Sequence, residues 1–147
     1  MSRGLAVLVG VAAGCLVGIQ APVNSRLGRV IGTLPAATFS FLVGTAALVL
    51  ITSIVGGGLG ALGGVNRAPA WALIGGLLGA VYVATALVVV RTLGAAGLTA
   101  VVITGQLAVS VAIDRFGWLG VARQPISSHR VVGLVLLVAG VVLVVRK

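Results

Sequence analysis

Five long apolar runs, separated by short polar stretches, constrain what this chain can fold into. None of them contains an acidic or basic side chain, and they cover residues 5–23, 35–55, 68–90, 94–113 and 131–145. Such runs approach the roughly 20 apolar residues that a helix needs to cross a bilayer. Strands would leave backbone groups unpaired in lipid unless they closed into a barrel, which requires alternating polar residues that are almost missing here. We therefore expect an all-α integral membrane protein.

The expected architecture is a five-transmembrane-helix bundle that forms one domain over residues 1–147. Its helices are placed at about residues 4–23, 34–55, 68–90, 94–114 and 129–146. The expected breaks are Pro22 with the polar residues 24–26, the glycine-rich residues 56–64, a turn over residues 91–94 and the polar stretch 115–130. Reading the first run as a cleaved signal peptide would remove one helix without changing the class.

The composition excludes most soluble functions. Of 147 residues, 60% are hydrophobic and 7% charged, against about 25% charged in soluble domains. One acid (Asp114), one histidine (His129) and one cysteine (Cys15) form no catalytic, metal-binding or disulfide set, so we expect neither an enzyme nor a cofactor. The basic residues are scattered rather than clustered, which argues against nucleic-acid binding. The expected surroundings are a lipid bilayer.

Positive charge is balanced across the expected membrane. With five spans, the amino-terminal side carries Arg3, Arg67, Arg115, Arg123 and Arg130, and the opposite side carries Arg26, Arg29, Arg91, Arg146 and Lys147. An excess of Lys and Arg on one side normally fixes the orientation of a membrane protein, so a balanced distribution does not specify which way this chain inserts. The chain is then expected to insert both ways and to pair as an antiparallel homodimer. Alternatively, the loop over residues 115–130 dominates and holds the amino terminus in the cytoplasm.

Five short sequence segments, spread along the chain, are informative when they are taken together. They are GIQAPVNSRLGR (residues 18–29), SFLVGT (40–45), GGLLGAVYV (75–83), GQLAVS (105–110) with DRFG (114–117), and the glycine-bearing segment 133–141. Together they resemble the YdcZ-type inner-membrane proteins of the drug/metabolite transporter superfamily. The resemblance covers nearly the whole chain.

The resemblance implies a multi-pass protein of the bacterial cytoplasmic (inner) membrane. Its five-helix unit is related to half of an inverted-repeat, ten-helix transporter. Because an odd number of helices makes two fused copies face opposite ways, a separate unit must find a second copy or a paralogous five-helix partner. The superfamily's substrates range over cations, metabolites and nucleotide sugars, so membership does not supply the substrate.

Polar side chains inside the apolar runs are the candidate substrate contacts, because each is costly in hydrocarbon. On the fourth run, Thr99, Gln106, Ser110 and Asp114 fall within about 80° of helix arc and form one polar stripe. Such a stripe is best buried against a partner helix or a water-filled path.

The first and third runs add three more polar groups. Gln20 and Asn24 share a helix face beside Pro22, where they bind a solute or satisfy the carbonyls freed by the proline. Tyr82 is mid-span and lines a pathway or packs in the core. The full expected pathway is Gln20, Asn24, Tyr82, Gln106, Ser110 and Asp114, which contact a small-molecule substrate.

Asp114 is the only side-chain carboxylate. If a carboxylate couples transport to protons, it must be this one, because amides do not titrate and arginine stays charged. The alternative is that Asp114, at the end of its helix beside Arg115, makes an interfacial ion pair that fixes the loop. Small multidrug transporters place their coupling glutamate in the first helix, where this chain has none. The sequence therefore favours a cationic solute no more than a neutral or anionic one.

Glycines at helical spacing allow close helix contact. Gly75 and Gly79 are four residues apart, and Gly133 and Gly140 are seven apart. Each pair packs helices within one chain or forms the dimer interface, for which the fifth helix is the favoured candidate.

The leading hypothesis is a secondary transporter. It exports a small organic solute by alternating access between two oppositely oriented five-helix units. The alternative, which the sparse polar content favours, is a non-transporting structural or accessory membrane protein, or one half of an obligate heterodimer.

Overall fold

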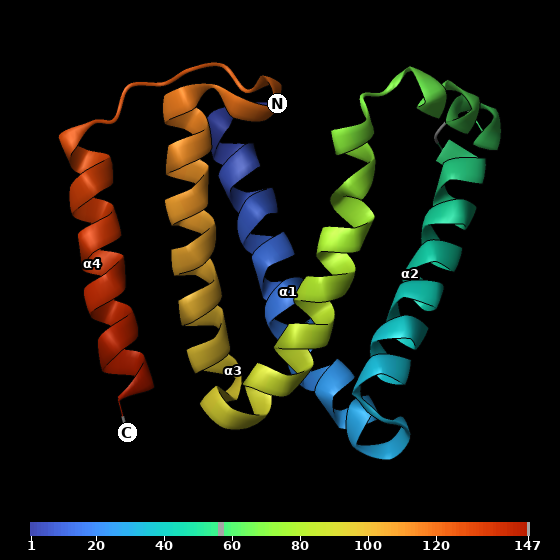
Figure 1. Ribbon diagram of the computed structural model, residues 1–147, viewed down its shortest axis with the longest axis horizontal. Coiled ribbons are helices and arrows are strands. Elements are labelled where there is room, and N and C mark those ends of the chain that lie inside the picture. The colour runs from blue at the N-terminus through green and yellow to red at the C-terminus, as the bar shows by residue number, and fades with distance from the viewer. Residues whose placement is uncertain (56–57, 147) are drawn as a thin grey trace. The chain divides into compact units, whose positions relative to one another are not determined.

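The computed structural model describes residues 1–55 and 58–146, and within them every regular element is a helix. The α-helices are α1 (Arg3–Ile31), α2 (Thr33–Val55), α3 (Gly75–Phe116) and α4 (Ser128–Val145) (Figure 1). Short 3-10 helices lie between them: η1 (Leu59–Arg67), η2 (Ala70–Ile74) and η3 (Trp118–Gly120). The described residues thus confirm the all-helical class. The chain forms two compact units, divided between Arg91 and Thr92.

α1 is longer than the sequence predicts. Its expected end at residue 23 depended on Pro22 and the polar residues that follow, yet α1 continues through both. Pro22 removes one backbone donor from the helix interior. The polar residues after it do not form a loop, because Asn24 donates a hydrogen bond to Ser40 of α2 and Ser25 donates one to the Leu87 carbonyl of α3. Neighbouring helices satisfy these groups, so the segment stays helical.

Gly32 alone joins α1 to α2. Its φ of 94° is a left-handed value that favours glycine. The Gly32 N–H donates to the Gly28 carbonyl, and the Gly32 carbonyl accepts from the Ala36 N–H, both at 3.1 Å. One residue therefore links the last turn of α1 to the first turn of α2.

A single non-helical residue divides α3. Gly94 has φ 72° and ψ 174°, so α3 consists of two helices that meet at this glycine. The expected turn over residues 91–94 is thus confined to one residue. The expected third helix, at 68–90, instead begins with the 3-10 helix η2, and its α-helical part starts at Gly75. Among the described residues, four helical stretches are long and apolar enough to cross a membrane, and the 47 residues of Ala70–Phe116 count as one of them.

The expected glycine-rich loop over residues 56–64 is partly helical. η1 begins at Leu59, after Gly58 with its φ of 85°. Residues 56 and 57 of this loop lie outside the described residues, as does Lys147 of the charge balance.

In the first unit, α1, α2 and the first part of α3 meet in an apolar core of two alanines, a valine and a leucine. Ala36 and Leu87 are fully buried, and Ala37 and Val83 are nearly so. A Cβ added at Gly28 of α1 would lie 3.5 Å from the Leu87 side chain and 3.6 Å from Ala36. Small side chains let helix backbones approach, and van der Waals packing of this kind holds helices together in lipid.

In the second unit, the last part of α3 and α4 form an antiparallel hairpin. A Cβ added at Gly97, early in this part of α3, would lie 3.9 Å from Val145 at the end of α4. Asp114, near the end of α3, pairs with Arg130 in the first turn of α4 at 2.9 Å. Contacts at both ends therefore fix the opposite directions of the two helices.

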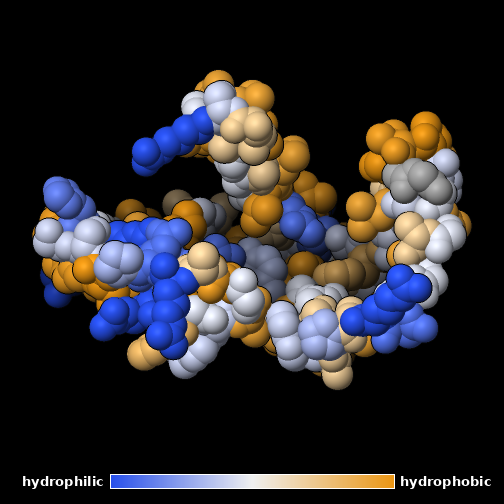
Figure 2. Space-filling view, turned by 90° about the horizontal axis from the view of Figure 1, so that it is seen from above, coloured by the Kyte–Doolittle hydropathy of each residue, from blue (hydrophilic) through white to orange (hydrophobic). Residues whose placement is uncertain are grey.

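Large apolar side chains lie on the outside of every α-helix. Leu16 is 70% exposed, Leu42 64%, Leu77 65% and Leu136 65%. Figure 2 shows hydrophobic side chains at the surface, in orange, beside separate hydrophilic groups, in blue. Lipid tails solvate such a surface, whereas water would not. The exposure fits a chain whose solvent is a bilayer.

Leu87→Ala is expected to destabilise the first unit by about 1–3 kcal/mol, less than in a soluble core because lipid or detergent is as apolar as leucine. The matched control is Leu77→Ala on the same helix, where the side chain is 65% exposed and little change is expected. Thermal unfolding in dodecyl maltoside, followed by circular dichroism, measures both variants. Equal losses of stability would contradict the described packing.

Candidate functional site

Gln20, Asn24 and Tyr82, three of the six predicted pathway residues, line one crevice of the first unit. Helix spacing brings the two amides together, since residues four apart on α1 share a face. The free volume is about 10 Å³, which is room for one water molecule. The rest of the wall is apolar and consists of Val17, Ala21, Val83, Ala86 and Leu87.

Asn24 is held in place by α2. The residue is only 7% exposed, and its Nδ2 donates to the Ser40 hydroxyl at 3.0 Å. This contact fixes the orientation of the amide at the crevice wall. Sequence reasoning did not single out Ser40, because a hydroxyl in the second apolar run gives no indication of its partner sixteen residues earlier.

Beside the crevice, Ser25 connects α1 to the first part of α3. Its hydroxyl donates to the Leu87 carbonyl at 3.4 Å and accepts from the Arg91 Nε at 3.3 Å. The Arg91 guanidinium lies close to Gly28, where an added Cβ would be 2.9 Å from Nη2. Sequence reasoning counted Arg91 only as a charge at a helix end. The sequence did contain one indication of this contact: Ser25 and Gly28 are three residues apart and share a face of α1, where a side chain from another helix can approach.

The other three predicted pathway residues lie in the second unit. Gln106 and Thr99 are exposed, so the predicted stripe is only partly covered by α4. Ser110 and Asp114 line a groove of about 430 Å³ between the last part of α3 and α4. The groove is completed by Ile103, Leu107, Val111, Arg130, Gly133 and Leu137.

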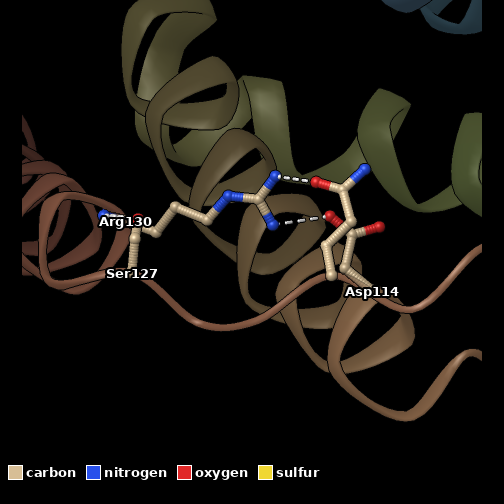
Figure 3. A network of polar contacts seen from close by, with 4 residues as sticks. Asp114, Ser127 and Arg130 are labelled. Atoms are coloured by element: carbon tan, nitrogen blue, oxygen red, sulfur yellow. Dashed lines mark hydrogen bonds and ion pairs between the residues drawn. The ribbon is translucent and has the colours of Figure 1, made fainter.

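Asp114 belongs to a network of polar contacts (Figure 3). Its carboxylate accepts from Arg130 Nη1 at 2.9 Å, and Arg130 Nη2 donates to the Gln124 side-chain oxygen at 2.6 Å. The Gln124 N–H donates to the Asp114 backbone carbonyl at 2.8 Å, and Ser127 caps α4. The ion pair that the alternative interpretation expected is therefore present, with Arg130 as the partner. Its side chains are partly exposed, Asp114 by 27% and Arg130 by 38%.

The predicted packing glycines differ in their surroundings. A Cβ added at Gly79 would lie 3.4 Å from the Phe41 ring of α2, so this glycine packs helices within the chain. At Gly75, Gly133 and Gly140, an added Cβ would meet no described atom within 4 Å. Among the described residues, Gly79 is thus the one of the four whose position shows packing inside one chain.

The chemistry that these groups offer is binding by hydrogen bonds. Two amides and a phenol line the crevice, Arg91 bonds to the Ser25 hydroxyl beside it, and Arg130 lines the groove. Within residues 1–55 and 58–146, no three His, Cys, Asp or Glu side chains gather into a metal-binding group. Solute recognition fits this set of groups better than bond cleavage.

The Asp114–Arg130 pair is expected to contribute less than about 1 kcal/mol, because exposed ion pairs gain little Coulomb energy in water. A double-mutant cycle with Asp114→Asn and Arg130→Gln measures the coupling from thermal unfolding. The coupling energy should be smaller still in 1 M salt, because the Debye length falls to about 3 Å and exposed charges are then screened. A salt-independent coupling above about 3 kcal/mol would instead indicate a buried pair.

The chain matches a known protein family over nearly its whole length. The family model described as "Putative inner membrane exporter, YdcZ" matches residues 5–143 and confirms the resemblance drawn from the sequence. The match includes the crevice, the Ser25–Arg91 contact and the Asp114 network. Neither a search of curated proteins nor a search of solved structures gave a match.

Proposed function

The chain belongs to the YdcZ family of inner-membrane exporters, and we propose that it exports a small organic solute by alternating access as a dimer of five-helix units. The family places it in the inner membrane as a multi-pass protein. The family is one of exporters and not of enzymes. The number of spans, the dimer and the pathway are the parts that we add.

Five crossings are supported by the length of Ala70–Phe116. A helix rises about 1.5 Å per residue, so its 47 residues would extend about 70 Å if straight. The hydrocarbon core is only about 30 Å thick. Because Gly94 breaks the stretch near its middle, two crossings account for it, and α1, α2 and α4 supply the other three.

The observation that carries the proposal is the crevice of Gln20, Asn24 and Tyr82. Polar groups in the hydrocarbon region are costly and mark substrate pathways. Here they come from two helices that otherwise expose large apolar side chains, and Asn24 is held by Ser40. The crevice has room for about one water, so a solute could enter it only if the surrounding helices moved apart, as alternating access requires.

The second unit supplies the other proposed pathway residues. Gln106 and Ser110 are exposed polar groups on an apolar helix, so a further protein surface or a water path is needed to accommodate them. Asp114, the single side-chain carboxylate of the chain, is the proposed site of proton coupling. In this proposal the Asp114–Arg130 ion pair takes part in coupling in addition to joining α3 to α4.

A dimer is supported by the odd number of spans and by the balanced arginines. α1 ends at Ile31, yet Arg26 and Arg29 remain near that end, so the charge balance is unchanged by the longer helix. Gly133 and Gly140 are open on α4, as an interface with a second copy or a paralogous partner would require.

Flux through proteoliposomes tests the pathway. Ethidium, citrate and sorbitol serve as cationic, anionic and neutral probes, driven by an imposed proton gradient. Asp114→Asn is expected to reduce proton-driven flux by about tenfold or more, and Gln106→Ala and Asn24→Ala to reduce flux of the transported probe. The control is Ser53→Ala, whose hydroxyl bonds only to Val49 of its own helix. Normal coupled flux in Asp114→Asn would remove this residue from the mechanism, and no flux in wild type would favour the accessory role.

Labelling of the termini tests the dimer. Cysteines introduced at residues 2 and 146, in a Cys15→Ser background, are reacted with a membrane-impermeant maleimide on intact and inverted vesicles. With balanced flanking charge, each terminus should be labelled from both sides in comparable amounts. Labelling from one side only would exclude the antiparallel homodimer, while leaving a paralogous partner open to test by co-purification.

A further inference from the structure

Arg91 stands out because its guanidinium is held in place without an acidic partner. Nε donates to the Ser25 hydroxyl at 3.3 Å, and Ser25, only 5% exposed, is itself bonded to the Leu87 carbonyl at 3.4 Å. Nη2 lies above Gly28, whose missing side chain leaves the space that the guanidinium uses. An interfacial arginine that only anchors a helix needs none of these contacts.

The charge around Arg91 points to an anion as its partner. The single acidic residue of the chain is Asp114, so residues 1–91 contain none, while Arg26 and Arg29 lie near Gly28 in the last turns of α1. Three arginines at one end of the first unit create a positive potential. A cation would be repelled there, and no carboxylate of this unit could bind it.

We infer that Arg91, positioned by Ser25 and Gly28, binds a carboxylate or phosphate group of the exported solute at the end of the crevice. The inference rests on the proposed export function and names its substrate class, a small organic anion. With Nε engaged by Ser25, the Nη1 and Nη2 groups remain for two parallel hydrogen bonds to such an anion.

The position of Arg91 links this anion site to the crevice. Leu87 lines the crevice and also accepts the Ser25 hydrogen bond, and Arg91 follows it by one helical turn, a rise of about 6 Å. On α1, Ser25 adjoins Asn24. A solute bound through its anionic group at Arg91 would therefore lie about one helical turn from Asn24 at the crevice wall.

Thermal unfolding of the purified protein in dodecyl maltoside tests the site without requiring transport. Citrate and inorganic phosphate are titrated against sodium chloride of equal ionic strength, and the rise in midpoint gives an apparent affinity. Wild type is expected to be stabilised by citrate and phosphate beyond the salt control. Arg91→Gln and Gly28→Ala should weaken this affinity by about tenfold or more, because each removes or displaces a charged hydrogen-bond donor.

Two matched variants separate a defined site from a general positive field. Arg26→Gln and Arg29→Gln each remove the same charge from the same end of the unit, and each should keep the affinity within about twofold. Gly28→Ala keeps every charge and only moves a flexible side-chain end, so its fold is expected to be retained. Equal weakening in all four variants, or no effect of Arg91→Gln and Gly28→Ala, would overturn the site.

A lipid headgroup offers the same chemistry as a soluble phosphate. The titration is therefore repeated with the protein in nanodiscs of phosphatidylcholine alone and of phosphatidylcholine with phosphatidylglycerol. Citrate binding through Arg91 in both supports a solute site. Stabilisation by phosphatidylglycerol alone, with no response to citrate or phosphate, overturns it in favour of a lipid anchor. Export of sorbitol or ethidium by a protein that binds no anion would refute this inference while leaving the export function intact.

Discussion

Lipid offers no hydrogen bonds, and this constraint governs the rest of the structure. Each polar group placed at the depth of the hydrocarbon must find its partner in the protein. Asn24 finds Ser40, and Ser25 finds the Leu87 carbonyl and Arg91, so three helices are joined by the few polar side chains that they carry. Because lipid tails are as apolar as leucine, these contacts and the close packing of alanines and glycines hold the first unit together.

The fold was largely predictable from the apolar runs, and the failures have a common cause. Runs without charge give helices because no other backbone state is satisfied in lipid. The expected end of the first helix was wrong because polar residues were treated as loop residues. Asn24 and Ser25 are residue types that are common where helices end. Here their hydrogen-bond partners lie on α2 and α3, and no local sequence pattern predicts such partners. Gly94, in contrast, lay within the predicted turn, since a positive φ favours the residue type that the sequence displays.

The candidate site was predictable to the extent that it depends on helix periodicity. Gln20 and Asn24 share a face by spacing alone, and the structure adds Tyr82 from α3 to the same crevice. Contacts between helices were not predictable. Asp114 has Arg115 next to it in sequence, but it pairs with Arg130, because the hairpin brings the start of α4 back to the end of α3. The position of Arg91 was likewise not predictable, because it depends on Ser25 and Gly28 of another helix.

The two units differ in the partners of their charged side chains, and this difference bears on the proposed mechanism. In the first unit Arg91 is held by the Ser25 hydroxyl, and residues 1–91 contain no acidic side chain to pair with it. In the second unit the only carboxylate is already paired with an arginine. An arginine without an acidic partner in its own unit favours binding of an anion, whereas the carboxylate of Asp114 already has a cationic partner. The proposed solute recognition and the proposed coupling then lie in different units of one chain, Met1–Arg91 and Thr92–Lys147.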